Sequence, residues 1–298
     1  MREFFITTDS NSDLPQEYIE KYGTAIIPQY YAFDDVMYGY EVNMTPAEFY
    51  DRMKKGALPE SQANNPAVIE EKFRDILNRG GDIIHIGFAS ELSVSYSNVC
   101  MVAEELKKQY PEAKITVIDS TIVSLGESIL VIRANEMKAK GASYEEVVEA
   151  IEAMKSHINA QFSVDDLFHL QRGGRISKAT AMVGTVLNLK PSMFINRKGE
   201  LISAGTVRGR MRSHQSMIDR MKATLGDAPD YTLPVGIVHA NCPEDANALA
   251  EKVKAETGYK TVMINDISPS IGTHTGPGAL GLLYYGAVRP EGASISIS

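Results

Sequence analysis

The chain has 298 residues, which is enough for one large domain or two of medium size with cores of their own. Apolar residues make up 44% and charged residues 23% of the sequence, as in ordinary globular proteins. The formal net charge of −8 argues against a nucleic-acid partner, because binding phosphates needs a basic face.

The first half of the chain alternates between strand and helix patterns. Short apolar runs predict the strands, and signals such as the capping box at Thr45–Glu48 mark where helices begin. Strands are expected at 4–8, 25–31, 83–87 and 115–118, and helices at 15–22, 45–55, 66–79, 96–110, 124–140 and 144–157. This alternation is typical of a parallel, doubly wound sheet, so we predict an α/β domain over residues 1–157.

The pattern changes near residue 158. The turn at 196–199 separates two strand-like runs at 192–195 and 200–207, which predicts an antiparallel hairpin. Further strands are expected at 160–164, 233–239, 261–267 and 279–285, and helices at 165–171, 210–225 and 243–257. We predict a second, α+β domain over residues 158–298 with a mixed or antiparallel sheet, and we expect the ligand at the interface of the two domains.

The cysteines and the hydropathy of the sequence indicate in which cellular compartment we expect the protein. Cys100 and Cys242 are far apart and belong to no cluster with metal-ligand spacing, so we expect lone thiols rather than a disulfide, and no metal or cofactor. No apolar run approaches the ~20 residues of a membrane span, and the N-terminus lacks the pattern of a secretion signal. We therefore expect a cytoplasmic protein whose contact with membranes is at most peripheral.

Three predicted strands run directly into serine-rich turns that open helices. Asp9-Ser10 and Asp119-Ser120 follow their strands in the same way, and a third strand leads to Ser90-Glu91-Leu92-Ser93. In a parallel sheet such turns share the carboxyl edge, where open α/β folds bind ligands and helix N-termini offer unpaired N–H groups. The pattern favours a site for a small anionic head group; the alternative is that these side chains only cap helices and shape turns.

Two later segments combine glycines with polar side chains. In Arg172-Gly173-Gly174-Arg175 the arginines suit a phosphate-bearing or acidic partner, or simply a solvated helix end. The densest glycine stretch runs from Gly272 to Gly281 and contains His274. Glycines such as Gly276 let a backbone approach a ligand closely, which makes His274 a candidate site residue, although a lone His more often has no such role.

Taken together, these segments resemble the DegV family over nearly the whole chain. The shared motifs are Asp9-Ser10 with Asp13-Leu14, Ser61-Gln62, Ser90 to Ser93, Val117 to Ser120 with Ser124 and Gly126, Leu170 to Ile176, Lys190-Pro191, and Gly272 to Gly278. The resemblance implies a two-domain α/β protein that buries one long-chain fatty acid in a tunnel between its domains and is not itself an enzyme. It also implies a partner, the catalytic subunit of a bacterial fatty acid kinase, which converts the presented carboxylate to an acyl phosphate.

The resemblance also implies roles for single residues. The carboxylate would be held by hydroxyls and an imidazole, from Ser61, Ser93 and His274. From the strand-end turns and the glycine stretch described above, we also expect Ser10, Ser120 and Gly276 in the ligand site. The surface facing the kinase would carry Arg172 and Arg175.

This chain departs from the family pattern at two places near the expected head group. Glu60 stands before Ser61 where the family has Thr, and Val94 follows Ser93 where the family has Gly. A Glu beside a fatty carboxylate would raise the pKa of one of the two groups or repel the ligand, unless Glu60 points to solvent. Both departures bear on how the carboxylate is held and leave the predicted fold unchanged.

A competing interpretation is an enzyme, a phosphotransferase or hydrolase that acts on a small anionic substrate through His274 and Ser93. The sequence contains neither a Walker A motif nor the G-x-S-x-G pattern of a nucleophile elbow. A fatty acid that remains bound during purification would favour the lipid-binding interpretation. The length and unsaturation of the acyl chain depend on the shape of a tunnel, which no sequence motif specifies.

Overall fold

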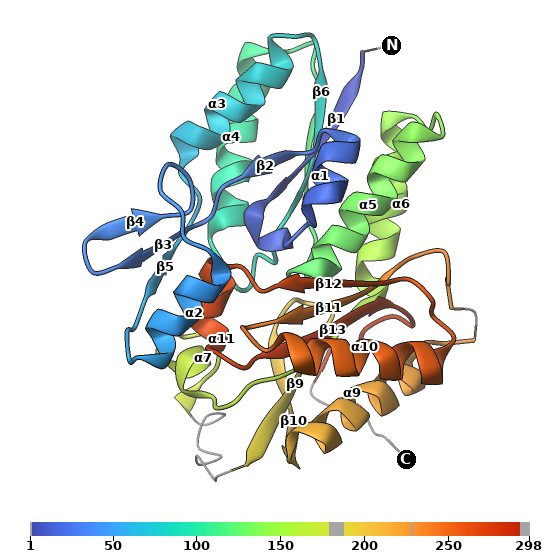
Figure 1. The fold of residues 1–298 in the computed structure, drawn as a ribbon. Coiled ribbons are helices and arrows are strands. Elements are labelled where there is room, and N and C mark those ends of the chain that lie inside the picture. The colour runs from blue at the N-terminus through green and yellow to red at the C-terminus, as the bar shows by residue number, and fades with distance from the viewer. Residues whose placement is uncertain (1, 179–187, 228, 293–298) are drawn as a thin grey trace.

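The computed structural model describes residues 2–178, 188–227 and 229–292, and its first sheet is parallel (Figure 1). The strands of this sheet are β1 (Phe4–Asp9), β2 (Ala25–Ile27), β6 (Asp82–Gly87) and β7 (Ile115–Asp119). They lie in the order β2-β1-β6-β7, and every neighbouring pair is parallel. The carboxyl ends of these strands therefore meet at one edge, as the alternating sequence pattern predicts.

Helices cover both faces of the parallel sheet. On one face, α3 (Pro66–Leu77) and α4 (Ser95–Gln109) bury Phe73 and Val99 against Ile83. On the other face lie α5 (Leu125–Ala139) and α6 (Tyr144–Met154). Other helices in residues 1–157 include η1 (Ser10–Ser12), α1 (Gln16–Tyr22) and η2 (Lys155–His157).

The second sheet is mixed. Its strands are β8 (Ile158–Ser163), β9 (Leu189–Ile195), β10 (Leu201–Arg208), β11 (Val235–His239), β12 (Val262–Asp266) and β13 (Leu280–Tyr285). Their order is β10-β9-β8-β13-β11-β12, and only the β11-β12 pair is parallel. Two helices, α9 (Arg210–Thr224) and α10 (Pro243–Thr257), cover one face of this sheet. A division of the chain into domains after residue 157 stays a prediction, although η2 ends there and β8 follows at once.

A third, small sheet differs from the sequence-based expectation. The single strand expected over 25–31 is two strands, because Pro28 has no N–H for a ladder and the chain turns after β2. The second of them, β3 (Tyr30–Phe33), pairs antiparallel with β4 (Val36–Tyr38) and β5 (Glu60–Gln62). Beside this sheet lie α2 (Pro46–Lys54), α7 (Phe168–Arg172) and α11 (Pro269–Thr275). The start of the glycine-rich stretch, from Gly272 to Thr275, thus belongs to α11.

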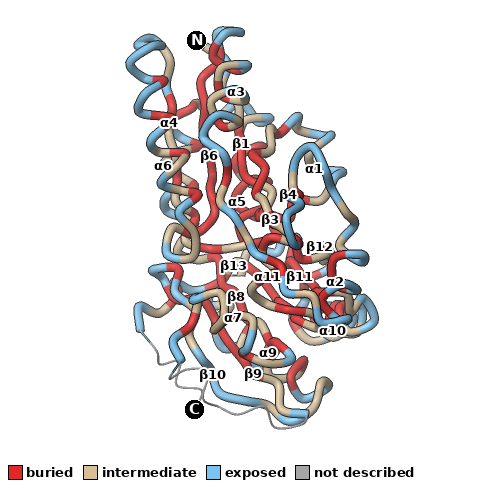
Figure 2. The backbone as a smooth tube through the Cα atoms, turned by 90° about the vertical axis from the view of Figure 1, so that its left-hand side faces the viewer, coloured by how far each residue is buried: buried red, intermediate tan, exposed pale blue. Residues whose placement is uncertain are grey.

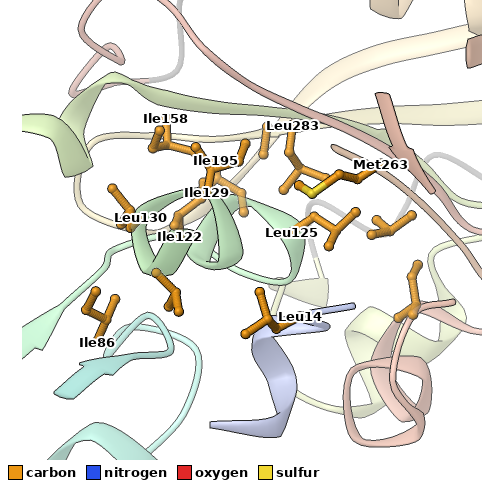
Figure 3. Packing of buried hydrophobic residues seen from close by; sticks show 14 of the residues in the cluster. Leu14, Ile86, Ile122, Leu125, Ile129, Leu130, Ile158, Ile195, Met263 and Leu283 are labelled. Carbon is orange, nitrogen blue, oxygen red and sulfur yellow. The ribbon is translucent and has the colours of Figure 1, made fainter. Parts of the chain in front are cut away.

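The centre of the molecule is α5, which contacts strands of both large sheets. Its residues from Leu125 to Ile132 are buried all around the helix, as expected for a helix with apolar neighbours on every side. Figure 3 shows Ile129 and Leu130 between Ile86 of the parallel sheet and Ile158 of the mixed sheet. Buried chain runs along β1, β6 and β13, whereas α3, α4 and α6 each expose their outer sides (Figure 2). One continuous core therefore joins the two large sheets.

Candidate functional site

A cavity of about 280 Å³ lies where the edge of the parallel sheet meets the mixed sheet and α11. Most of its wall is apolar, with side chains that include Phe88, Leu92, Val123, Phe162, Ile195 and Leu283. Polar residues in the wall include Gln29, Ser61, Ser93, Arg175, His274 and Thr275. The cavity thus offers a large apolar surface together with a small set of hydrogen-bonding groups, which is the usual composition of a site for an organic ligand.

The central strands of the mixed sheet place their apolar side chains in this wall through the alternation of a β-strand. Ala160 pairs with Leu283 and Phe162 pairs with Gly281, so these four positions share one face of the sheet, and all four line the cavity. The alternate residues Leu282 and Tyr284 of β13 pack under α9 and α10. One face of β8 and β13 therefore builds much of the cavity wall, to which Gln161 and Leu280 also contribute, and the other face packs in a separate core.

His274 and Ser61 form a direct pair in the cavity wall. The hydroxyl of Ser61 on β5 lies 2.7 Å from Nε2 of His274 on α11. Burial, together with the positive charges of Arg175 and Arg172, lowers the pKa of His274 to about 3. The imidazole is therefore neutral at physiological pH and acts as a hydrogen-bonding group, not as a cation.

Ser93 lines the same cavity from the turn before α4. Its hydroxyl lies 2.9 Å from the hydroxyl of Ser95 and accepts a hydrogen bond from the Ser95 backbone N–H. Arg175 donates from Nε to the carbonyl oxygen of Leu92, the residue before Ser93, at 3.0 Å. Arg175 also donates to the carbonyl oxygen of Gly173, a residue that packs against the His274 ring, so these contacts bring Ser61, Ser93 and His274 to one end of the cavity.

The two arginines of the Arg172–Arg175 segment occupy different positions. Arg175 is half-buried and lines the cavity, and burial lowers its pKa. Arg172 lies outside the cavity wall and donates to the carbonyl oxygen of Pro59 at 2.5 Å. The segment therefore reaches the cavity through Arg175 and the neighbouring surface through Arg172.

The glycines near His274 serve close packing. A Cβ atom at Gly173 would lie 2.0 Å from Nδ1 of His274, and one at Gly272 would lie 2.4 Å from the hydroxyl of Tyr50. Gly276 does not line the cavity, and a Cβ atom there would lie 2.4 Å from the ring of His169. These glycines let α7 and α2 approach α11, so they hold His274 in place without touching the cavity themselves.

Ser10 and Ser120 lie outside the cavity wall. The Ser10 hydroxyl accepts from the backbone N–H of Gln29, and the Ser120 hydroxyl donates to the carbonyl oxygen of Ile122. Asp9 accepts from the N–H groups of Asn11 and Phe88, which is the capping and turn role that the sequence left open as the alternative. The serine-rich strand ends therefore contribute Ser93 to the site and use their other hydroxyls to shape the turns.

Glu60 and Val94, the two departures from the family pattern, lie in different positions relative to the cavity. Glu60 is exposed at the start of β5 and does not line the cavity, so its carboxylate points to solvent as the simpler of the two interpretations requires. Val94 lines the cavity while 65% of it is exposed. Val94 therefore lies where the cavity meets the surface.

Sequence reasoning missed several polar residues of the site. Gln29, Asn11 and Ser124 line the cavity, and Ser95 stands directly behind Ser93. Asn11 and Ser124 belong to segments that the family resemblance covers, so their positions in the motifs could have indicated them. Gln29 follows Pro28 in the connection between β2 and β3, and no local pattern marks it because its partners come from distant parts of the chain.

Three buried carboxyl groups lie behind the cavity. Burial raises the pKa of Asp9 to about 6 and that of Asp13 to about 7, and it raises the pKa of Glu127 far above its ordinary value. Asp13 accepts hydrogen bonds from the Ser124 hydroxyl and from the backbone N–H of Ser268, the residue before α11. The carboxyl of Asp13 thus ties the N-terminal end of α11 to the edge of the parallel sheet.

Comparison with known proteins identifies the family. Residues 3–287 match the family model described as "Uncharacterised protein, DegV family". The chain belongs to the DegV family. A DegV domain-containing protein of Clostridium perfringens is 32% identical over 97% of this chain and 99% of its own length, and one of Caldanaerobacter subterraneus is 31% identical over 95% and 99%. The resemblance predicted from the sequence motifs is confirmed.

Solved structures of DegV proteins share the fold. A DegV family protein of Thermus thermophilus, described as fatty-acid-binding, superimposes with a TM-score of 0.86 at 27% identity, covering 96% of this chain and all of that one. DegV of Bacillus subtilis, described as a fatty acid binding protein, superimposes with a TM-score of 0.82 at 26% identity and the same coverage. The predicted α/β class, with a parallel sheet and a mixed sheet, is confirmed.

Proposed function

We propose that this DegV protein is a lipid-binding protein rather than an enzyme, and that it holds one long-chain fatty acid in the cavity. The observation that supports this most directly is the composition of the wall, which is largely apolar and carries the Ser61–His274 pair, Ser93 and Arg175 at one end. The DegV proteins of Thermus thermophilus and Bacillus subtilis, described as binding fatty acids, share this fold.

The free energy of burial indicates that the tail of the fatty acid provides affinity and that its head group provides recognition. Burying each methylene contributes ~0.8 kcal/mol, so a tail of about fifteen contributes roughly 12 kcal/mol when it leaves water. The same tail is already buried in a membrane, so extraction from a bilayer is roughly neutral for this part. Recognition of a fatty acid, as opposed to any apolar chain, therefore depends on the hydrogen-bonding groups around Ser61 and Ser93.

An enzyme that uses His274 as a general base finds little support in this geometry. His274 is paired with Ser61 and not with Ser93, and no hydrogen bond or ion pair links it to a carboxylate among the described residues. Its pKa of about 3 makes it a weak base at neutral pH. The pair fits a binding role, in which a neutral imidazole orients a hydroxyl toward the ligand.

The finer part of the proposal concerns the partner. We propose that the protein presents the carboxylate to a kinase subunit that forms the acyl phosphate, and that Arg172 and Arg175 contribute to this encounter. Two guanidinium groups at the head-group end suit a phosphate-bearing complex. Because Arg175 also lines the cavity, Arg172→Glu is the cleaner test: it should reduce kinase-dependent acyl phosphorylation at least tenfold and leave the lipid content unchanged. Equal acyl phosphorylation with Arg172→Glu and with the wild type would contradict this role.

The proposal also places the protein in the cytoplasm, with peripheral contact to membranes when lipid is loaded or released. Among the described residues, no helix is long and apolar enough to cross a bilayer. Fractionation of cells that express the tagged chain would test the location.

Mass spectrometry tests the central claim. Native spectra of the purified protein should show one bound mass of a fatty acid, and lipid extraction after denaturation should identify it. Ala160→Phe fills the cavity wall and should lower the bound fraction at least fivefold, whereas Ala67→Phe on the exposed side of α3 should not. A bound nucleotide or sugar, or equal lipid content in both variants, would contradict the proposed function.

A further inference from the structure

A chain of hydrogen bonds runs from Ser93 in the cavity wall into the protein. The hydroxyls of Ser93 and Ser95 lie 2.9 Å apart, and the hydroxyl of Ser95 donates to Oε1 of Gln29 at 2.8 Å. Ser95 and Gln29 are almost completely buried, with 1% and 3% of their surface exposed. Behind Gln29 lies Asp9, whose pKa is raised by burial and partly lowered again by its hydrogen bonds and by the Gln29 amide.

Counting the available hydrogens shows which group donates and which accepts in each of these hydrogen bonds. A serine hydroxyl has one hydrogen, and the hydrogen of Ser95 is engaged with Gln29. Ser95 can therefore only accept from Ser93, so the hydrogen of Ser93 points to Ser95 and away from the ligand. What Ser93 offers to the cavity is a lone pair.

Asp9 fixes the orientation of the Gln29 amide, the first group in the series of hydrogen bonds from Gln29 through Ser95 to Ser93. Both carboxylate oxygens of Asp9 are acceptors, and the amide nitrogen of Gln29 faces them without a well-formed bond of its own among the described residues. In the reverse orientation, Oε1 of Gln29 would face the ionised Asp9, and two acceptors would oppose each other in a buried place. The network therefore assigns the nitrogen to the Asp9 side and the oxygen to Ser95.

The other hydroxyl of the head-group end has the opposite polarity. Nδ1 of His274 is buried without a partner among the described residues and lies near the positive charges of Arg175 and Arg172. A lone pair suits that place better than an N–H group, so the hydrogen of the neutral ring belongs on Nε2. Nε2 then donates to the Ser61 hydroxyl, and the hydrogen of Ser61 is free to point to the ligand.

One donor and one acceptor at the same end of a cavity match the two oxygens of a carboxylic acid, whose carbonyl accepts and whose hydroxyl donates. We propose that Gln29 is a positioning residue that sets the donor direction of Ser95 and Ser93, so that the site binds the fatty acid with its carboxyl group protonated. This rests on the proposed function. A neutral carboxyl also avoids the cost of burying a charge in an apolar cavity.

Charged groups near the head-group end also affect whether the bound carboxyl group is ionised. Arg175 favours an ionised ligand, although its guanidinium already donates to the carbonyl oxygens of Leu92 and Gly173. Asp9, behind Gln29, carries the opposite charge when ionised and favours a neutral ligand. Arg172 and His169 stand farther back, beside His274. The proposal requires that the hydrogen-bond pattern outweighs the charge of Arg175.

The experiment measures the protonation of the bound ligand directly. Palmitic acid labelled with ¹³C at the carboxyl carbon is bound to the full chain, and its chemical shift is followed by NMR from pH 5 to pH 9. An unperturbed carboxyl titrates at about 4.3. We expect the bound group to be protonated at pH 7, and the affinity to fall about tenfold for each pH unit between the free and the bound pKa, because only the bound state holds its proton there.

Two variants separate the polarity of Ser93 from simple packing. In Ser95→Ala, Ser93 loses its acceptor and can donate to a carboxylate, so the bound pKa should fall by at least one unit; Gln29→Leu should do the same. Ser97→Ala, on the exposed side of the same helix, should leave the bound pKa unchanged. A bound palmitate that is ionised at pH 7 in the wild type, or a bound pKa that is the same in all four proteins, would overturn this inference alone. A wild-type protein that binds no palmitate would overturn the proposed function and the inference with it.

Discussion

At the scale of single residues, the position of His274 depends on where neighbouring side chains are absent. Gly173 has ordinary helical backbone geometry with φ of −74°, so its conformation alone does not require glycine. What requires glycine is the imidazole of His274, which occupies the space of a Cβ atom. Gly174, the next residue, has φ of 73° and no neighbour within 4 Å of the Cβ position. The two adjacent glycines therefore have different reasons to be glycine.

This difference gives a matched pair of variants. Gly173→Ala should displace His274 from Ser61 and lower the bound fatty acid at least fivefold, because its methyl group would lie 2.0 Å from Nδ1. Gly174→Ala should lower the free energy of unfolding by about 1 kcal/mol through backbone strain and leave the lipid content unchanged. Lipid extraction and urea denaturation measure the two effects. Equal lipid content in Gly173→Ala and the wild type would show that α7 and α11 separate without disturbing the site.

At the scale of elements, α11 is anchored at one end and lines the cavity at the other. Its N-terminal end is held by Asp13, and its last turn carries His274 and Thr275. Asp13 has φ of 52°, a left-handed conformation that Asp and Asn tolerate better than most residues. The short segment after β1 therefore positions a helix that follows it by more than 250 residues.

Protonation of Asp13 should make stability depend on pH. Burial raises its pKa from 3.8 to about 7, so the folded state holds a proton that the unfolded state has already lost between these values. The stability from this carboxyl is full below pH 3.8 and is lost as the pH rises to 7. Asp13→Asn should remove roughly 2–4 kcal/mol of the decline in unfolding free energy between pH 4.5 and pH 7.5. Asp9 and Glu127 would keep part of the decline.

The control for this prediction is Asp34→Asn. Asp34 also has φ of 52°, but it lies exposed between β3 and β4. Urea denaturation should give Asp34→Asn the same pH profile as the wild type. Parallel profiles for Asp13→Asn and the wild type would mean that Asp13 is already ionised in the folded protein.

The sequence predicted most elements of the two large sheets because their signals are local. Alternating strands and helices, capping residues such as Thr45 and the turn at 196–199 each act within a few residues. The β3-β4-β5 sheet escaped prediction because β5 pairs with a strand about thirty residues earlier, and its three residues have no pattern of their own. Register between distant strands depends on tertiary packing, which a local pattern does not contain.

The candidate site residues likewise fall into those that the sequence predicted correctly to line the cavity and those that it did not. The motifs that carry the family resemblance contain Ser61, Ser93 and His274, and all three line the cavity. Ser10 and Ser120 stand in equally suggestive turns, but their hydroxyls are used within those turns. A strand end and a hydroxyl do not reveal whether the side chain points to the cavity or back into the loop, because that depends on the torsions of the turn and on the packing around it.

At the scale of the whole molecule, the two large sheets are joined on both sides of the cavity. Asp13 and Asn265 link them on one side, through the hydrogen bonds of Asp13 to Ser268 and of Asn265 to the carbonyl oxygen of Asp13. On the other side lies Arg289, 2% exposed, which donates to the carbonyl oxygens of Thr121 and Asn196. A buried arginine near the end of the described chain thus bridges a loop of the parallel sheet and the β9-β10 hairpin.

Replacement of Arg289 tests how much the molecule depends on this bridge. Arg289→Met fills a similar volume but leaves the carbonyl oxygens of Thr121, Asn196 and Lys155 without their donor, so we expect a loss of about 2–4 kcal/mol in unfolding free energy. Arg197→Met is the matched control, because Arg197 makes an exposed ion pair with Glu291 and such pairs contribute about 0–1 kcal/mol. Urea denaturation at pH 7 compares the two variants. If Arg289→Met cost no more than Arg197→Met, water would replace the guanidinium without loss, and α5 with its apolar neighbours would be sufficient to hold the sheets together.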